Sequence, residues 1–213
     1  MRYYIADCHF FHEALNREMD HRGFASVEEM NEYMIKRWNE KVRNRDEVVI
    51  LGDLSMGNAE QTNALLDRLQ GKLFLIVGNH DNRYLRSKIF HKERFGWIYP
   101  YAELHDDGRK VVLSHYPIAC YNGQYLKNKK GEPRTYMLYG HVHDSHDERL
   151  IEQYQQMVEK TRIADRDGGT QSLSSHMINC FCMYSDYQPL SLDEWIALTK
   201  QRLIRCQNVE DSL

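Results

Sequence analysis

Short apolar runs recur along the chain, and each stops abruptly at polar or glycine residues. Five of them, rich in β-branched and aromatic side chains, occupy residues 3–6, 48–51, 73–77, 111–113 and 136–139. Runs of this length and composition are typical of buried strands. We expect a further strand over Met177–Tyr184, where apolar residues return late in the chain.

Between these runs, apolar residues spaced three or four positions apart predict helices. The sequence Ser26-x-x-Glu29 has the form of a capping box and precedes Met30 and Met34 at helical spacing. The predicted helices cover residues 26–43, 59–69, 84–91 and 147–162, with a last one from the capping box Ser191-x-x-Glu194 to about residue 204.

The order of these elements favours one α/β domain over residues 1–213. Strands alternate with helices early and dominate later, which is typical of an α/β protein with a mixed sheet or sheets. No internal repeat, low-complexity tract or Pro/Ser-rich linker divides the chain, and its length suits one domain of roughly 100–200 residues. Residues 144–175, a polar helix followed by a loop with Gly168-Gly169, have the character of an insertion.

Composition narrows the class of protein. The 213 residues include 28 Lys+Arg and 31 Asp+Glu, for a net charge of −3, with 42% hydrophobic and 28% charged residues. These proportions are ordinary for a globular protein, and the mild acidity argues against a protein that coats nucleic acid. With no signal-peptide pattern and no apolar run near ~18 residues, we expect a cytoplasmic protein without a membrane partner. The five cysteines fit reduced thiols.

Each of the five apolar runs ends directly in residues that can bind a metal. These are Asp7-Cys8-His9, Gly52-Asp53, Gly78-Asn79-His80-Asp81, Ser114-His115 and Gly140-His141-Val142-His143. In open α/β folds, ligands bind outside the carboxyl ends of strands, so five segments would deliver polar groups to one edge. Because residues i and i+2 of an extended segment share a face, we expect Asp7 and His9 to point into one site.

The ligand types point to two metal ions. Oxygen donors and imidazoles together make seven side chains, Asp7, His9, Asp53, Asn79, His115, His141 and His143. If Asp53 bridges with both oxygens, each ion receives four protein ligands, which leaves room for water and a phosphate oxygen. Mixed oxygen and nitrogen ligation without thiolate suits Mn²⁺, Fe or Zn²⁺. The sequence does not choose among them, and Mn²⁺ is the first we would test.

The order D-x-H, GD, GNHD, H and GHxH, from Asp7 to His143, resembles that of the calcineurin-like metallophosphoesterases. The resemblance implies a four-layer α/β/β/α sandwich of two mixed sheets flanked by helices, with the site at the strand ends. It implies a first metal held by Asp7, His9, Asp53 and His143, and a second held by Asp53, Asn79, His115 and His141. By the same resemblance His80 is the proton donor to the leaving group and Asp81 orients its imidazole.

The expected activity is two-metal hydrolysis of a phosphate ester by a metal-bound hydroxide. Two divalent ions outweigh the carboxylates of Asp7 and Asp53, so the pocket attracts an anion although the chain is slightly acidic. Asn79 is expected to help fix the phosphoryl group. His12 either reaches the substrate phosphate or is a structural residue that is solvated or caps a nearby backbone group. The chain has neither a G-x-x-x-x-G-K-[ST] loop nor a G-x-S-x-G elbow, which disfavours other enzyme classes.

The substrate stays open between several classes. A small phosphodiester or phosphomonoester, plausibly nucleotide-like, ranks first because no recognition domain is appended. A nuclease acting on a short end, a phosphoprotein phosphatase and a non-catalytic interaction scaffold on the same fold are the alternatives. The basic stretch Tyr121–Arg134 has two interleaved tyrosines and would suit nucleic acid, but we favour a solvated loop there. Nucleic acid is therefore possible as a partner but not favoured, and the oligomeric state is open.

Overall fold

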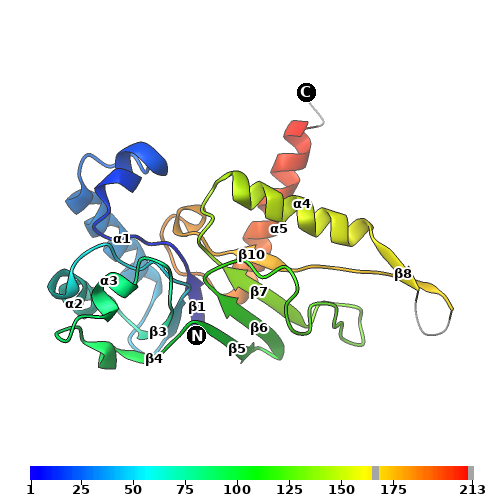
Figure 1. Ribbon diagram of the computed structural model, residues 1–213, viewed down its shortest axis with the longest axis horizontal. Helices are drawn as coiled ribbons and strands as arrows, with labels where there is room; N and C mark the ends of the chain where they lie inside the picture. The colour runs from blue at the N-terminus through cyan, green and yellow to red at the C-terminus, as the bar shows by residue number, and fades with distance from the viewer. Residues whose placement is uncertain (165–167, 211–213) are drawn as a thin grey trace.

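The computed structural model describes residues 1–164 and 168–210 of the protein. Two four-stranded sheets stack face to face, with helices on the outer face of each (Figure 1). One apolar cluster lies between the first sheet and its helices, a second between the two sheets, and a third on the outer face of the second sheet. The expected four-layer α/β/β/α sandwich is confirmed.

The first sheet is parallel throughout. Its strands are β1 (Arg2–Ile5), β2 (Glu47–Ile50), β3 (Lys72–Ile76) and β4 (Phe95–Tyr99), in that spatial order. Alternate residues face opposite layers: Val48 and Ile50 pack against the helices, while Val49 packs between the sheets. We expected both sheets to be mixed. This one is not, because a helical crossover joins each strand to the next and so returns the chain in the same direction.

The helices of this layer are α1 (Val27–Lys41), α2 (Ala59–Arg68) and α3 (Asn82–Leu85). Ser26 caps α1 as expected, since its hydroxyl accepts the N–H of Glu29 at 3.1 Å. The helix expected over residues 84–91 is wrong in length. The chain leaves α3 through tight turns, one of them closed by the N–H of Ser87 on the carbonyl of Tyr84, and reaches a 3₁₀ turn over Lys92–Arg94.

The second sheet is mixed, in the spatial order β10-β7-β6-β5. Its strands are β5 (Tyr101–Asp106), β6 (Arg109–Ser114), β7 (Thr135–Tyr139) and β10 (Met177–Asn179). The pattern of apolar runs missed β4 and β5, whose residues are largely half-buried or exposed. The strand expected over Met177–Tyr184 ends early, because the chain turns into a 3₁₀ helix over Cys182–Ser185.

Two helices belong to the second half of the chain, α4 (His146–Lys160) and α5 (Leu192–Glu210). α4 packs on the outer face of the second sheet. The segment 163–175, expected as a loop, instead contributes a hairpin of β8 (Arg162–Ala164) and β9 (Thr170–Ser172) that projects from the body (Figure 1); residues 165–167 lie outside the described residues. Among the described helices, none is long and apolar enough to cross a membrane.

Candidate metal centre

The loops that follow β1, β2, β3, β6 and β7 meet at one edge of the stacked sheets, where the carboxyl ends of the parallel strands lie. These loops carry all seven of the expected ligand residues. The side chains gather into two neighbouring groups that share Asp53. The structure therefore brings together the side chains that the sequence nominated.

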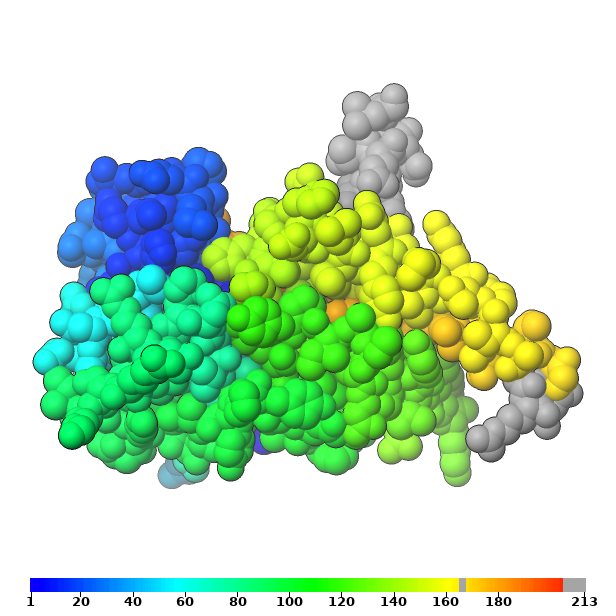
Figure 2. Space-filling model, in the orientation of Figure 1, coloured from blue at the N-terminus to red at the C-terminus, as the bar shows by residue number. Residues whose placement is uncertain are grey.

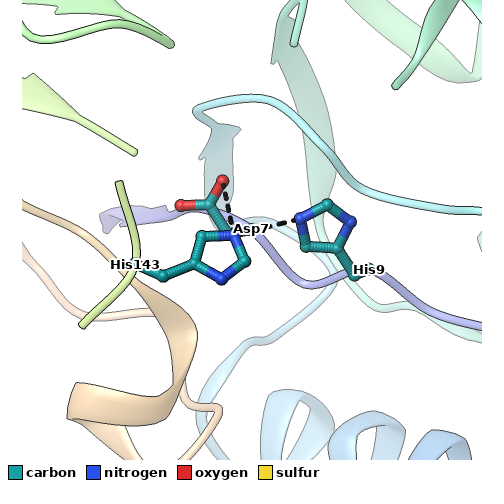
Figure 3. A group of neighbouring side chains, drawn as sticks. All are labelled: Asp7, His9 and His143. Carbon is teal, nitrogen blue, oxygen red and sulfur yellow. Dashed lines mark hydrogen bonds and ion pairs between the residues drawn. The ribbon is translucent and has the colours of Figure 1, made fainter. Parts of the chain in front are cut away.

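The first group contains Asp7, His9 and His143 (Figure 3). The Nε2 atoms of His9 and His143 lie 3.2 Å apart, and Nε2 of His143 lies 3.8 Å from Oδ1 of Asp7. Asp53 joins the group through Oδ2, which is 3.6 Å from Nε2 of His9. These are the four residues expected at the first metal, and of them only His143 is not fully buried.

The second group centres on the side-chain oxygen of Asn79. Nε2 of His115 lies 2.9 Å from this oxygen and Nδ1 of His141 lies 3.0 Å from it. Oδ2 of Asp53 is 3.4 Å from Nε2 of His115. Asp7, which the resemblance placed at the first metal alone, also borders this group, because its Oδ1 lies 3.9 Å from Nδ1 of His115.

The carboxylate of Asp53 joins the two groups through a single oxygen. The count of four protein ligands for each ion assumed that both oxygens of Asp53 bridge. Oδ2 does face both groups, but Oδ1 accepts the backbone N–H of His80 at 2.8 Å. One oxygen is thus committed to holding the carboxylate in place, and the other is left between His9 and His115.

Backbone strain is concentrated in these loops. Five of the seven residues have a positive φ, namely Asp7 (55°), His9 (48°), Asp53 (53°), His141 (72°) and His143 (50°). Our expectation that Asp7 and His9 share a face of an extended segment is therefore wrong, although both side chains reach the site. Left-handed conformations of residues other than glycine persist only where the surroundings enforce them, and they cluster at functional sites.

Two glycines let the loops approach one another closely. A Cβ atom on Gly78 would lie 2.2 Å from Oδ1 of Asp53, and one on Gly140 would lie 2.5 Å from Oδ2 of Asp7. Both distances are far below van der Waals contact, so any side chain would displace a carboxylate. The glycines that end the apolar runs thus make room for the two aspartates.

Hydrogen bonds on the far side of two imidazoles fix which nitrogen faces the site. Nδ1 of His115 lies 2.8 Å from the carbonyl of Leu51 and must donate to it. Nδ1 of His143 lies 2.8 Å from Oδ1 of Asp20. Each contact leaves the Nε2 lone pair of a neutral ring directed at the site, the arrangement that a histidine ligand requires. Nδ1 of His9, by contrast, is buried without a partner within the described part of the chain.

Sequence reasoning missed Asp20 and Arg22. The guanidinium of Arg22 is buried; it donates to Oδ2 of Asp20 at 2.9 Å, to the carbonyl of Asp7 at 3.1 Å and to that of Cys8 at 2.7 Å. The pair therefore ties the segment 12–24 to the first ligand loop and to His143. No sequence motif at Asp20-His21-Arg22 predicts this role, because Asp20 and Arg22 act through contacts with residues distant in the sequence.

The ionisable groups of the site perturb one another strongly. Burial raises the pKa of Asp7 to about 6 despite the nearby imidazoles of His143 and His115. Burial would also raise the pKa of Asp53, but hydrogen bonding and charge from His115 and His9 lower it to about 2. The pKa of His115 is raised to about 9, because the carboxylates of Asp53 and Asp7 outweigh its burial. Such mutual perturbation in a cleft is typical of functional sites.

His80 and Asp81 do not form the pair that we expected. The ring of His80 is half-exposed at the edge of the site, with Nε2 4.0 Å from Oδ2 of Asp53. Asp81 is fully buried, and its carboxylate accepts the N–H groups of Asp53, Leu54 and Gly78 and the hydroxyl of Tyr84. Its oxygens are thus directed at the loop backbone, so Asp81 holds two ligand loops together and does not orient the imidazole.

The site opens into a cleft of about 840 Å³. His12 lines it together with His9, His80 and His141. Nδ1 of His12 accepts the N–H of Leu15 at 3.2 Å, so the neutral ring carries its hydrogen on Nε2. His12 is therefore a capping residue and also a cleft residue with a donor to offer.

The donor set fits divalent metal ions. Within each group, lone pairs of carboxylate, amide and imidazole atoms face one another at 2.9–3.8 Å. Two described groups, Asp7–His9–His143 and Asp7–Asp53–His115, have ligand atoms all within 4.8 Å of one another. A cation between such acceptors satisfies them together, and this mixture of oxygen and nitrogen suits a divalent first-row metal.

The chain is similar in sequence and fold to known proteins. The family model described as calcineurin-like phosphoesterase matches residues 3–197. The uncharacterized protein MJ1445 of Methanocaldococcus jannaschii is 31% identical, over 97% of this chain and 96% of its own length. The gene 66 protein of Mycobacterium phage L5 is 28% identical, over 66% and 76% respectively. A solved structure, the protein of unknown function AQ665 from Aquifex aeolicus, shares the fold with a TM-score of 0.62 at 23% identity, covering 91% of this chain and 96% of that one.

Proposed function

The chain belongs to the calcineurin-like phosphoesterase family, and from that premise we propose that it is a hydrolase that cleaves a small phosphate ester with the help of two divalent metal ions. The observation that carries the proposal is the convergence of seven ligand-type side chains in two groups around Oδ2 of Asp53. Divalent ions held there supply Lewis acidity to the phosphoryl group and to an attacking water. Mn²⁺ is our first choice of metal.

The chain's own residues take the remaining roles. His80 stands beside Asp53 at the edge of the cleft and gives a proton to the leaving oxygen. An imidazole suits this role because a ring nitrogen can carry a proton and donate it to the leaving oxygen. The Nε2–H of His12 donates to a phosphoryl oxygen, and Asn79 helps to hold the phosphoryl group while it binds metal.

A small substrate is favoured over a nucleic acid or a phosphoprotein. A cleft of about 840 Å³ has the size of a small-molecule site. A non-catalytic scaffold on this fold would have no use for a half-exposed histidine beside a complete ligand set. We further propose a cytoplasmic location.

Hydrolysis of bis-p-nitrophenyl phosphate with added Mn²⁺ tests the proposal. We expect Asp53→Asn to lose bound metal, measured by elemental analysis, and to lower kcat/KM by roughly 10²–10³-fold or more. Asp107→Asn, at an exposed turn remote from the cleft, is the control and should match the wild type. An Asp53→Asn protein with full activity, or a metal-loaded wild type without any, would contradict the proposal.

The role of His80 has a separate test. His80→Ala should keep both metal ions, because none of the seven ligands is lost, but its kcat should fall by roughly 10²–10⁴-fold. The loss should be largest for a diester with a poor leaving group, since p-nitrophenolate leaves without protonation. Full rate of His80→Ala on an alkyl leaving group would show that another residue supplies the proton.

A further inference from the structure

The cleft is bounded by two walls that lie largely outside the family motifs, although the second begins within the last of them. One is the segment 12–24, which includes a π-helical turn over Leu15–Met19. The other runs from Val142 into the start of α4 and is joined by residues 181–184. In Figure 2 the blue residues of the first wall and the yellow-green residues of the second rise on either side of a hollow. Whatever is attached to a phosphate at the metal centre must lie between them.

The walls present an apolar surface. Its side chains are those of Leu15, Met19, Val142, Phe181, Met183 and Tyr184. Met19 lines the cleft and is 66% exposed. Of the others, Met183 and Tyr184 are partly exposed, while Leu15, Val142 and Phe181 are buried, and Phe181 stacks on the ring of His143 with ring centroids 4.7 Å apart. A hydrocarbon or aromatic group next to the phosphate would be desolvated here.

The charges along the cleft are those of acids. Asp144 and Asp147 are exposed at the second wall, and Asp20 lies in the first. No lysine or arginine is among the described residues that line the cleft. Because Asp20 is already neutralised by Arg22, Asp144 and Asp147 join Asp7 and Asp53 as four carboxylates, which offset the charge of two divalent ions. The positive field is therefore confined to the ligand groups and does not extend along the walls.

The basic stretch of the chain lies at the other edge of the sheet. Arg134 immediately precedes β7, and β6 and β7 run parallel, so Arg134 is beside Lys110 at their amino ends. The ligands His115 and His141 follow the carboxyl ends of the same strands. The lysines at 127, 129 and 130 are absent from the described lining as well. This stretch gives a polyanion no support at the metal centre.

We propose that the cleft selects phosphodiesters with a single negative charge and an apolar or aromatic arm, and rejects polyanions such as nucleic acids and nucleoside polyphosphates. This rests on the proposed function, whose substrate class it specifies. A singly charged phosphodiester is matched by the ligand groups alone, and its arm fits between the walls. Each further phosphate would face Asp144 and Asp147 without a cation to meet it.

A matched pair of substrates tests the charge selection. Thymidine 5′-(p-nitrophenyl phosphate) and its 3′-phosphorylated form share a scissile bond and a leaving group, and differ by roughly two negative charges. We expect the first to have a kcat/KM ~10-fold or more above the second with Mn²⁺. Equal or reversed values would overturn the proposal, while the turnover itself would still support hydrolysis as the function.

A gain-of-function variant guards against misfolding as an explanation. Met19→Lys places a cation at the mouth on an already exposed position. It should raise kcat/KM for the 3′-phosphorylated substrate about 5-fold relative to the other, the effect of one nearby charge. Ile163→Lys, which puts the same charge on the projecting hairpin, should leave the ratio unchanged. If both variants change the ratio alike, the cleft walls do not set the selectivity.

If turnover is too slow to follow, binding measurements test the same charge selection and the preference for an apolar arm. Calorimetric titration of Mn²⁺-loaded His80→Ala protein with the same two compounds gives the ratio of Kd directly. Equal Kd values would overturn the charge selection, and tighter binding of the singly charged compound would support it. For the apolar arm, phenyl p-nitrophenyl phosphate should have a kcat/KM ~10-fold higher, or a Kd ~10-fold lower, than methyl p-nitrophenyl phosphate, because its ring is buried. Equal values would remove the apolar arm from the proposal.

Discussion

The ligand loops and the segment 12–24 that leans over them are held in place by different means. The loops are locked many times over, by left-handed backbone at five ligands, by glycines that admit the aspartates and by the four hydrogen bonds to Asp81. The segment 12–24 is attached to the site chiefly through the buried pair Asp20–Arg22. The ligand loops are therefore held rigidly. The wall that we assign to selectivity contacts them mainly through one ion pair, while Phe24 at its end packs against Tyr33 and Tyr187.

Of the three changes discussed below, removal of the Asp20–Arg22 ion pair should lower the free energy of unfolding the most. In Asp20→Ala the buried guanidinium of Arg22 loses its carboxylate partner, and an unpaired buried charge typically costs about 3–5 kcal/mol. We expect a loss of this size in the free energy of unfolding, measured by urea denaturation in metal-free buffer. Glu32→Ala removes the carboxylate of an exposed pair with Arg68 and should cost only ~0–1 kcal/mol. Equal losses would mean that the wall has other attachments of similar strength.

The sequence predicted the ligand loops well because their chemistry is local. Each candidate ligand directly follows an apolar run, so the position of a strand end and the type of residue sufficed to nominate the seven side chains that converge in the structure. The role of Asp81 could not be found in this way, since two of its four partners are backbone groups of a loop almost thirty residues away. A motif shows which residues are present but not what their side chains contact.

The walls and edges were less predictable for a related reason. Asp20 and Arg22 act through contacts with His143 and with the backbone of Asp7, which no spacing in the sequence reveals. Strands β4 and β5 were missed because they are partly exposed and so lack a continuous apolar run. Positions that are defined by tertiary contacts leave no periodic trace.

The second wall has a different attachment, the buried carboxyl group of Glu148 in the first turn of α4. The hydroxyl of Tyr139 donates to it at 2.8 Å, and Arg202 lies 3.8 Å away. Burial raises its pKa from 4.5 to about 7, despite the opposing effects of Tyr139 and Arg202. The folded state therefore favours the protonated acid, so this contribution to stability is present below pH ~4.5 and is lost as the pH rises through about 7.

Glu148→Gln, which imitates the protonated acid, should remove that loss. Relative to the wild type, its free energy of unfolding should rise by roughly 3 kcal/mol, steadily between pH ~4.5 and pH ~7 and with little further change above that. Glu159→Gln, on the exposed part of the same helix, should show a constant difference. A flat difference for Glu148→Gln as well would mean that Glu148 ionises freely, and that both walls are anchored by charged pairs.

The smallest expected change in the free energy of unfolding comes from Tyr84→Phe, a substitution that distinguishes a structural from a catalytic role for Asp81. Tyr84→Phe removes one of the four donors to that carboxylate and leaves the three backbone donors in place. A hydrogen bond to a charged group is worth about 1.5–3 kcal/mol, and we expect the lower value, because the remaining donors still solvate the charge. Metal content and kcat should stay within about twofold of the wild type, because neither His80 nor a ligand is touched.

Tyr33→Phe removes a hydroxyl that donates to the exposed carboxylate of Asp186. It is the matched control and should change neither stability nor kcat. A fall in the kcat of Tyr84→Phe at unchanged stability would instead place Asp81 in proton transfer with His80. The hydrogen bonds to Asp81 would then serve catalysis as well as the structure of the ligand loops.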